Sequence, residues 1–373
     1  INIVTPNREK LTILNTVENQ PGKMVGTIAR AVTDNSLPLR VVGYDKDGLS
    51  IARAAVLMPQ GEATAEFEFV QPVELRNQIV RVEIENASNA GAVQLLDDSN
   101  RRRIVGLISG QSVDISQPLL SPLYYINRAL SPFSDLRDAD TANIDEAAKD
   151  LIAQKVSAIV LADVGTLPEE AKENLIKFVE DGGLIIRFAG PRLAANPDGA
   201  LLPVDLVQGD RFLGGALSWD TPKAISPFDP ASPFFGLPKP NGVSVSRQVL
   251  AVQSRELESR TWARLEDGTP LITANRMDAG WVVLFHVNSD NNWSNLPLSG
   301  SFVEMLRRTV NLSRSTNSTN SANEEVRLPP LEILDGKGVL TAPPASSKPL
   351  VVEQGIQPAI TIETPPGLYG TTD

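Results

Sequence analysis

The sequence contains no cysteine and only one histidine, His286, among its 373 residues. The absence of cysteine excludes disulfides, thiolate metal sites and a cysteine nucleophile. Aromatic residues make up only 5% of the chain, and no apolar run approaches the ~20 residues of a membrane-spanning helix. No signal peptide opens the chain, which begins at Ile1, and we expect it to be a soluble piece of a longer protein.

Positive charge is also in short supply. The chain has 34 Lys and Arg against 45 Asp and Glu, a formal net charge of -11. This balance argues against nucleic acid or anionic lipid as a partner, because both require a basic surface. The one basic run, Arg101–Arg103, is short, and we interpret it as solvated charge at a domain junction. A hydrophobic content of 42% supports a globular core, and the length favours two or three domains.

The first hundred residues show the period of β-strands. Between Glu62 and Phe69, apolar residues alternate strictly with Glu and Thr, which places the apolar side chains on one buried face. Asp47-Gly48 separates two apolar runs, a pattern typical of a hairpin. Short strands separated by turn residues predict an immunoglobulin-like β-sandwich over residues 1–100.

From residue 101 the pattern changes to buried strands that alternate with helices. The apolar runs at 104–108, 156–162 and 184–189 are typical of parallel strands covered on both faces. Helical periodicity fills the intervals between them, and short joints imply right-handed crossovers. We predict a doubly wound, mainly parallel α/β domain over residues 101–313, resembling the class I glutamine amidotransferase-like or flavodoxin-like arrangement.

Three local patterns add detail to this domain and to the segment that follows it. Asn143 and Glu146 have the spacing of a capping box and predict the start of a helix. The Pro-, Gly- and Asp-rich stretch 191–241 is interpreted as a long excursion from the sheet, with a small hairpin around 212–219. Residues 314–373 are predicted to be a polar linker followed by an extended Pro-rich segment.

Polar residues follow several of the predicted strands. In an open parallel sheet, ligands bind beyond the carboxyl ends of the strands, where the strand order reverses. Ser109, Asp163 and His286 each follow a predicted strand, and Asp290 and Trp293 come shortly after His286. We therefore predict a ligand-binding crevice lined by these five residues.

The same residues give little support for catalysis. Ser109, His286 and Asp163 have the residue types of a catalytic triad, but no G-x-S-x-G motif surrounds the serine. The oxygen-rich segment 288–292 lacks the acidic spacing of a calcium loop and favours a turn. No glycine-rich phosphate motif occurs. We predict no catalytic residue, no metal and no cofactor.

One stretch resembles the class I glutamine amidotransferases. In such enzymes the catalytic histidine follows a late strand in a Phe-His-Pro-Glu type motif, and Phe285-His286 stands in a similar context. Asn288 occupies the position of the orienting Glu, and the turn at Asp163-Val164-Gly165 offers no cysteine. The resemblance implies that His286 keeps its position without a chemical partner.

A closer resemblance is to uncharacterised bacterial membrane proteins with an N-terminal BatA-like (aerotolerance regulator) segment and amidotransferase-like domains. The segments that carry it are 73–78, 93–97 leading into 102–107, 293–300 and 365–370. It implies a location between membrane segments, on the periplasmic face of the bacterial inner membrane. It also implies association with von Willebrand A-type proteins and a MoxR-type AAA ATPase system.

These observations predict a non-catalytic extracytoplasmic interaction module rather than an enzyme. The alternative is a small-ligand or glycan-binding domain that uses the crevice at the carboxyl ends of the strands. A third hypothesis is a hydrolase that depends on Ser109 or on a metal.

Overall fold

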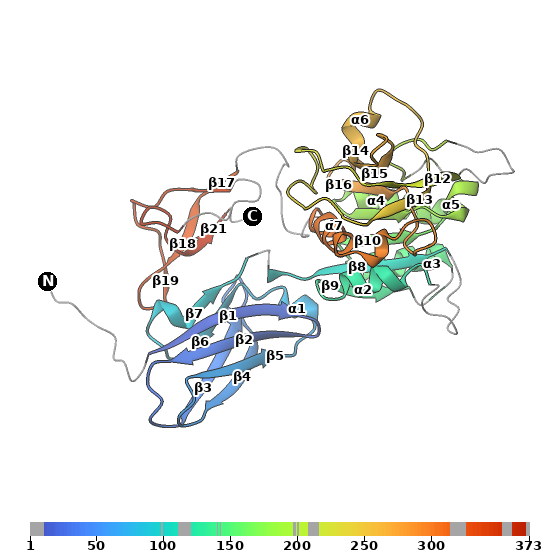
Figure 1. Cartoon of the computed structure of the whole chain (residues 1–373). Helices are drawn as coiled ribbons and strands as arrows, with labels where there is room; N and C mark the ends of the chain where they lie inside the picture. Colours follow the sequence, from blue (N-terminus) through green and yellow to red (C-terminus); the bar gives the residue numbers. More distant parts are fainter. Residues whose placement is uncertain are drawn as a thin grey trace. The chain divides into compact units, whose positions relative to one another are not determined.

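A computed structural model of the chain defines its fold (Figure 1). It describes residues 11–97, 100–110, 121–139, 141, 143–196, 199, 201–207, 216–313, 326–352 and 360–370. The chain divides into two compact units, one formed by residues 103–318 and the other by residues 1–102 together with 319–373.

The first part of the smaller unit consists of two antiparallel sheets. One has the order β1-β2-β5 and the other β4-β3-β6-β7. The strands are β1 (Thr12–Gln20), β2 (Lys23–Arg30), β3 (Leu37–Tyr44), β4 (Ser50–Met58), β5 (Thr64–Phe69), β6 (Arg81–Ile84) and β7 (Val93–Leu95), with a short helix α1 (Val73–Arg76) and a 3-10 turn η2 (Ala90–Ala92). The hairpin predicted at Asp47-Gly48 is confirmed, because β3 and β4 pair across it.

One hydrophobic core lies between these two sheets. Phe67 and Phe69 of β5 are 3% and 1% exposed, which confirms the buried face predicted from their alternation. They share the core with Val41 of β3 and Val82 of β6 in the other sheet. Arg102 is only 4% exposed and donates from its guanidinium to the main-chain oxygen of Asn19. The basic run is therefore not simply solvated charge.

The end of the chain adds short strands to this unit. β17 (Val326–Leu328) pairs with β20 (Leu350–Val352), and β18 (Pro330–Leu334) pairs with β19 (Leu340–Thr341) and β21 (Gly367–Tyr369). A hydrogen bond from the Ala90 amide to Gly336 O joins this segment to the sandwich-like sheets. The predicted extended segment therefore contains strand pairing, and the polar tract 314–325 lies outside the described residues.

The larger unit is built on a seven-stranded sheet with the order β14-β15-β16-β11-β10-β8-β9. Its strands are β8 (Arg103–Ser109), β9 (Ser134–Asp138), β10 (Ala158–Ala162), β11 (Leu184–Phe188), β14 (Thr261–Arg264), β15 (Pro270–Met277) and β16 (Gly280–Phe285). The five strands from β16 to β9 are parallel, and β14 and β15 extend the sheet by antiparallel pairing.

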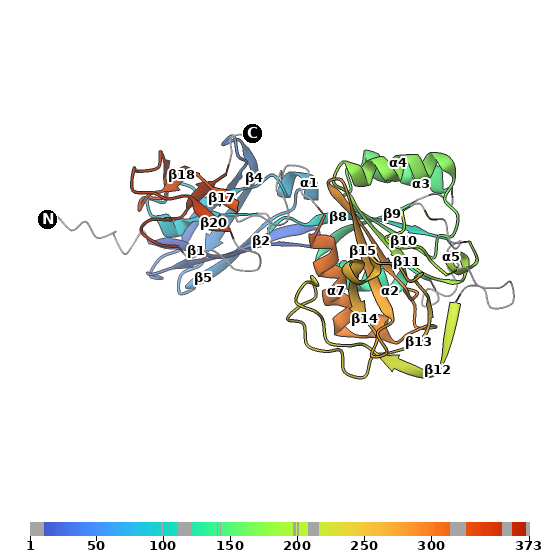
Figure 2. The ribbon, with the colours of Figure 1, turned by 90° about the horizontal axis from the view of Figure 1, so that it is seen from above.

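Helices cover both faces of this sheet (Figure 2). α2 (Tyr124–Leu130) and α7 (Gly300–Asn311) lie on one face, and α3 (Ile144–Ala153) and α4 (Glu169–Glu180) on the other. Leu107 of β8 belongs to the core with α2 and α7, whereas the neighbouring Gly106 faces Leu151 of α3. Burial on both faces explains why β8, β10 and β11 appear in the sequence as continuous apolar runs.

The strand β9 was missed by the sequence analysis. Only Leu136 in its five residues is apolar, and the strand forms the edge of the sheet beside β8. An edge strand needs little apolar character, because one side of its ladder and part of its face remain in water.

The helix start predicted at Asn143 is confirmed, but the reciprocal bond of a capping box is not formed. Asn143 caps α3, but its side chain accepts from the amide of Asp145. Glu146 instead accepts from the Thr141 hydroxyl at 3.0 Å, so it does not return to the cap residue.

The excursion after β11 folds back onto the sheet. The chain after β11 forms α5 (Pro191–Ala195), a two-stranded ribbon of β12 (Ala216–Ala224) and β13 (Ser244–Val249), and α6 (Leu257–Arg260). After β16, the 3-10 turn η5 (Leu296–Leu298) precedes α7. Trp219 lies in β12, which pairs with β13, and residues 212–215 of the hairpin predicted around 212–219 lie outside the described residues. No helix among the described residues is long and apolar enough to cross a membrane.

Candidate functional site

The strand order reverses between β8 and β10. From β8 the chain passes to β9 on one side, and then to β10, β11 and β16 on the other. Ser109 ends β8, and the Gly110 amide donates to Ala162 O at the end of β10. Asp163 follows directly, so the structure brings the Ser109-Gly110 and Asp163 segments together at the switch point. Ligands of open α/β sheets bind at such points.

The segment after β16 approaches this point from two strands away, because β11 separates β16 from β10. Asp290 is close enough for its charge to raise the pKa of Asp163. Asp290 is 9% exposed, and its Oδ1 accepts hydrogen bonds from the Asn288 side chain and the Asn292 amide. These bonds form a turn, as the sequence predicted. No group of three or more His, Asp or Glu side chains suited to a metal ion occurs among the described residues.

The imidazole of His286 is fully buried and fully engaged. Nδ1 lies 2.9 Å from Val249 O of β13, and Nε2 lies 3.0 Å from the Thr273 hydroxyl of β15. A carbonyl oxygen only accepts, so we assign the proton to Nδ1, which leaves Nε2 to accept from Thr273. Both nitrogens are therefore used, and no hydrogen bond to Ser109 or Asp163 is formed.

Burial also decides the charge of this ring. His286 is 0% exposed, and desolvation lowers its pKa from 6.5 to about 4, against a smaller opposite effect of the Val249 carbonyl. The imidazole is consequently neutral at pH 7. A neutral ring with both nitrogens bonded to structural partners cannot accept a proton from a substrate without breaking one of those bonds.

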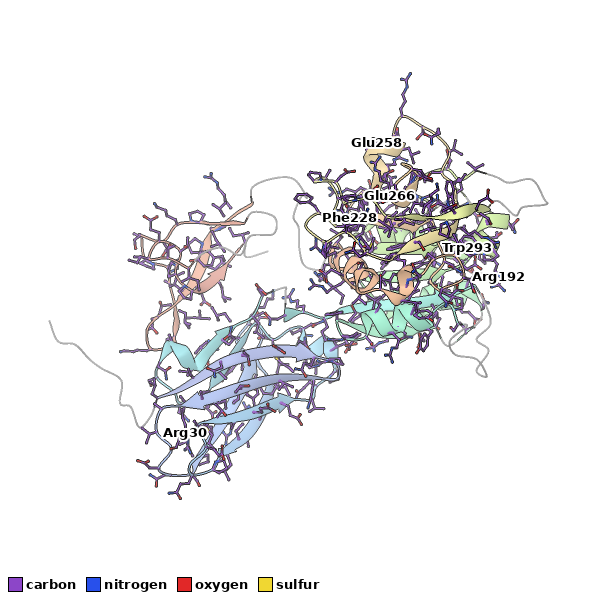
Figure 3. All side chains as sticks on the ribbon, in the orientation of Figure 1. Arg30, Arg192, Phe228, Glu258, Glu266 and Trp293 are labelled. Atoms are coloured by element: carbon purple, nitrogen blue, oxygen red, sulfur yellow. The ribbon has the colours of Figure 1, made fainter. Side chains whose placement is uncertain are left out.

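Trp293 is part of a second hydrophobic cluster rather than an exposed platform. Its side chain is 3% exposed and packs in a cluster with Leu193 of α5 and Val249 of β13. Figure 3 labels Trp293 together with Arg192, the residue next to Leu193. The main-chain oxygen of Trp293 accepts hydrogen bonds from the amides of Ser246 and Arg247, which holds β13 next to the Trp293 segment.

Asp163 has a different environment from His286. Its Oδ1 accepts hydrogen bonds from the amides of Arg192, at 2.9 Å, and Leu193, at 3.2 Å, in the first turn of α5. Its Oδ2 is buried and has no hydrogen-bond partner in the structure. Desolvation raises the pKa of this carboxyl group, and the two amides and the charge of Arg192 counteract the rise. Half of the carboxylate is thus available to another group.

A buried arginine supports the turn that carries Asp163. Arg187 on β11 is 0% exposed, and its guanidinium donates to Val164 O at 2.6 Å and to Gly165 O at 3.3 Å. The sequence analysis missed Arg187, Arg192 and Thr273, because their contacts join segments that are separated in the sequence. It also missed Gln248 of β13, which is 0% exposed and whose side-chain amide atoms both lack partners.

The larger unit also has a surface hollow away from Asp163 and His286. It has a volume of about 570 Å³ and lies between the segment 238–243 and the start of α7. Leu298, one of its lining residues, is 61% exposed, and Phe235, three residues before Pro238, is 56% exposed.

No protein-family model matches the chain, and no curated protein matches it. Among solved structures, the chain is similar to a cytoplasmic protein from Salmonella typhimurium, with a TM-score of 0.41 and 14% identity over 57% of this chain and 98% of that one. It is also similar to a putative ThuA-like protein from Parabacteroides merdae, with a TM-score of 0.37 and 13% identity over 60% and 94% of the two chains. A β-galactosidase from Rahnella sp. R3 has a TM-score of 0.33 and 13% identity, over 57% of this chain and 32% of the enzyme. The structural neighbours thus include ThuA-like proteins, of glutamine amidotransferase-like fold, at low identity.

Proposed function

We propose that this chain is a non-catalytic interaction module whose larger unit is a degenerate amidotransferase-like domain. The observation that carries the proposal is the state of His286: its ring is buried, and both nitrogens are bonded to structural partners. The one histidine of the chain is thereby committed to holding β13 and β15 together. Because the chain has no cysteine and its one histidine is held in this way, a fold of this type is better suited to a scaffold than to acyl-transfer chemistry.

Exposed apolar side chains give the module a candidate contact surface. Leu298 lines the 570 Å³ hollow, and Phe235 comes three residues before Pro238, another residue of its lining; both apolar side chains are more than half exposed. Exposed apolar side chains are typical of protein-binding surfaces when they form a patch. Phe235 belongs to the excursion between β11 and β13, which is the kind of segment that carries recognition on a rigid scaffold.

The resemblance to the BatA-like membrane proteins supplies the partner and the location of this proposal. In that context the β-sheets of the smaller unit are an immunoglobulin-like domain, and the chain is displayed on the periplasmic face of the bacterial inner membrane. Its partners are von Willebrand A-type proteins that work with a MoxR-type AAA ATPase system. The acidic net charge of -11 agrees with a protein partner rather than with nucleic acid.

A binding assay with a purified von Willebrand A-type protein tests this proposal. The wild-type chain and the variant His286→Gln should bind equally well wherever both are folded. The double variant Phe235→Ser, Leu298→Ser should bind roughly tenfold more weakly or worse, because interface anchors are worth over 1 kcal/mol each. Loss of binding in folded His286→Gln, with binding retained in the double variant, would contradict the proposal.

A specific observation favours a second function, the binding of a small ligand at the switch point. The Oδ2 atom of Asp163 is buried without a partner at the edge where open α/β sheets bind ligands. Ser109 pairs with Ala162, the residue before Asp163, and Asp290 is near enough to raise the pKa of Asp163. The second function is compatible with the first, because the two surfaces involve different residues.

A further inference from the structure

The backbone at Asp163 is strained and tightly enclosed. Its φ of +49° lies in the left-handed region, which residues other than glycine rarely adopt. A Cβ atom on Gly190 would lie 2.3 Å from the Asp163 Cγ, and one on Gly110 would lie 2.1 Å from the Asp163 main-chain oxygen. Glycine is therefore required at both positions. Strain of this kind persists where the surrounding structure holds a residue in place, and it clusters at ligand sites.

The carboxyl group held by this turn is only half satisfied. Two amides of α5 bind Oδ1, at 2.9 and 3.2 Å, and Oδ2 has no partner although Asp163 is only 4% exposed. An unpaired buried carboxylate oxygen is expensive, because the group has lost water without gaining a hydrogen bond. The structure of the turn therefore provides one strong acceptor without providing a donor for it.

The charges around Oδ2 select the kind of donor. The positive charge of Arg192 lowers the pKa of Asp163, and the negative charge of Asp290 raises it by a smaller amount. The Arg192 side chain is exposed, and its contact with Asp163 is made by the main-chain amide rather than by the guanidinium. A hydroxyl group would give Oδ2 a hydrogen bond but would leave the buried carboxylate of Asp163 without a cation in direct contact. An ammonium group gives both a hydrogen bond and a positive charge.

We propose that Asp163 Oδ2 binds the ammonium group of a small amine ligand at the switch point between β8 and β10. The inference rests on the second function proposed above and names its ligand class. The amine donates to Oδ2, and its charge offsets that of Asp163 and Asp290. The site is less suited to a divalent metal, because such an ion needs several oxygen ligands and Oδ1 already accepts hydrogen bonds from two amides.

The test uses ethylammonium chloride as the probe and the whole chain as the protein. Thermal stability is followed by calorimetry while the concentration of the probe is increased. Sodium chloride is adjusted to keep the ionic strength constant. Ethanol serves as the neutral control, since it has the same carbon chain and a hydroxyl in place of the ammonium. The wild-type chain should show saturable stabilisation in about the millimolar range for a probe of this size. Ethanol should give no saturable shift.

Matched variants locate the binding. Asp163→Asn keeps the two amide contacts and tolerates a positive φ, and it should bind the probe roughly tenfold more weakly or worse, because it removes a charge-assisted hydrogen bond. Asp278→Asn makes the same change at another left-handed aspartate, exposed in the turn after β15, and should bind as the wild type does. Asp290→Asn should weaken binding roughly two- to fivefold through charge alone; this variant replaces Asp163→Asn in the test if the latter does not fold.

Three outcomes would overturn the inference. They are the absence of saturable stabilisation by the probe, equal binding by wild type and Asp163→Asn, and stabilisation by magnesium chloride but not by the amine. None of these outcomes concerns Phe235 or Leu298. Failure of the amine site therefore leaves the proposed protein-binding role standing, and the two can fail separately.

Discussion

His286 and Asp163 are buried titratable residues of the same α/β unit, but their hydrogen bonding differs. Both nitrogens of His286 have partners, its neutral form is favoured, and the ring joins β13 to β15. Asp163 has one oxygen without a partner, and its backbone is strained. A fully satisfied buried group contributes to stability, whereas a half-satisfied one in a strained turn reduces it. His286 is thus used in packing, whereas Asp163 keeps one buried oxygen without a partner, and the proposed ligand site rests on that oxygen.

The largest expected effect is that of removing the imidazole. His286→Ala should lower the free energy of unfolding by about 3–5 kcal/mol, because it leaves a cavity and two polar groups without partners. Urea denaturation measures the change. Thr273→Val removes only one of the two hydrogen bonds and should reduce stability by about 1–2 kcal/mol. An effect of His286→Ala below 1 kcal/mol would show that the His286 side chain is not structural.

The pH dependence of stability sharpens the comparison. The folded-state pKa of His286, about 4, lies below its unfolded value of 6.5. Its contribution is therefore fully present above pH 6.5 and is lost as the pH falls towards 4, to a total of about 3 kcal/mol. Denaturation curves between pH 7 and 4 should show this loss in the wild type. His286→Gln should lack that part of the acid destabilisation, and an unchanged profile would contradict the assignment.

The contribution of Asp163 to stability should depend on pH in the opposite direction. Its pKa is raised by burial above the ordinary value of 3.8, so its contribution is greatest below that pH and is lost as the pH rises. Asp163→Asn should therefore stabilise the chain at pH 7, by roughly 1 kcal/mol, since functional residues are often suboptimal for stability. The gain should disappear below about pH 4. Destabilisation at pH 7 would indicate that the carboxylate is a structural cap and no more.

The smallest effect is expected at Gln248. Both amide atoms are buried without partners, so Gln248→Met, of similar size, should be neutral or stabilising by less than about 1 kcal/mol. Gln253→Met, the same change at an exposed position, provides the control and should fall within about 0.5 kcal/mol of wild type. A marked loss of stability in Gln248→Met alone would mean that ordered water bridges the amide to its surroundings.

Much of the fold follows from local pattern. The alternation in β5 and the apolar runs of β8, β10 and β11 were predictable because burial imposes a pattern on the sequence. β9 was not predictable, since an edge strand with one apolar residue has no such period. The pairing of β12 with β13 was missed because its two strands lie about twenty residues apart and the pattern of neither one specifies the partner.

The candidate site was predictable only as a location. The switch-point rule placed Ser109 and Asp163 together, because it depends on strand order alone. The partners of each side chain are set by long-range packing: Val249 and Thr273 for His286, and α5 for Asp163. A sequence pattern does not reveal that one of these groups is fully bonded and the other is not.

The most direct test of the account is an NMR titration of the chain's single histidine, which needs no assignment by mutagenesis. The imidazole nitrogen and carbon shifts of His286 would be followed from pH 8 down to the onset of unfolding. We predict a neutral ring with the proton on Nδ1 that stays unprotonated through pH 6 and titrates near pH 4, if the fold persists that far. A midpoint near the ordinary value of 6.5 would show an imidazole open to solvent and available for chemistry, and it would contradict the claim that this histidine is structural.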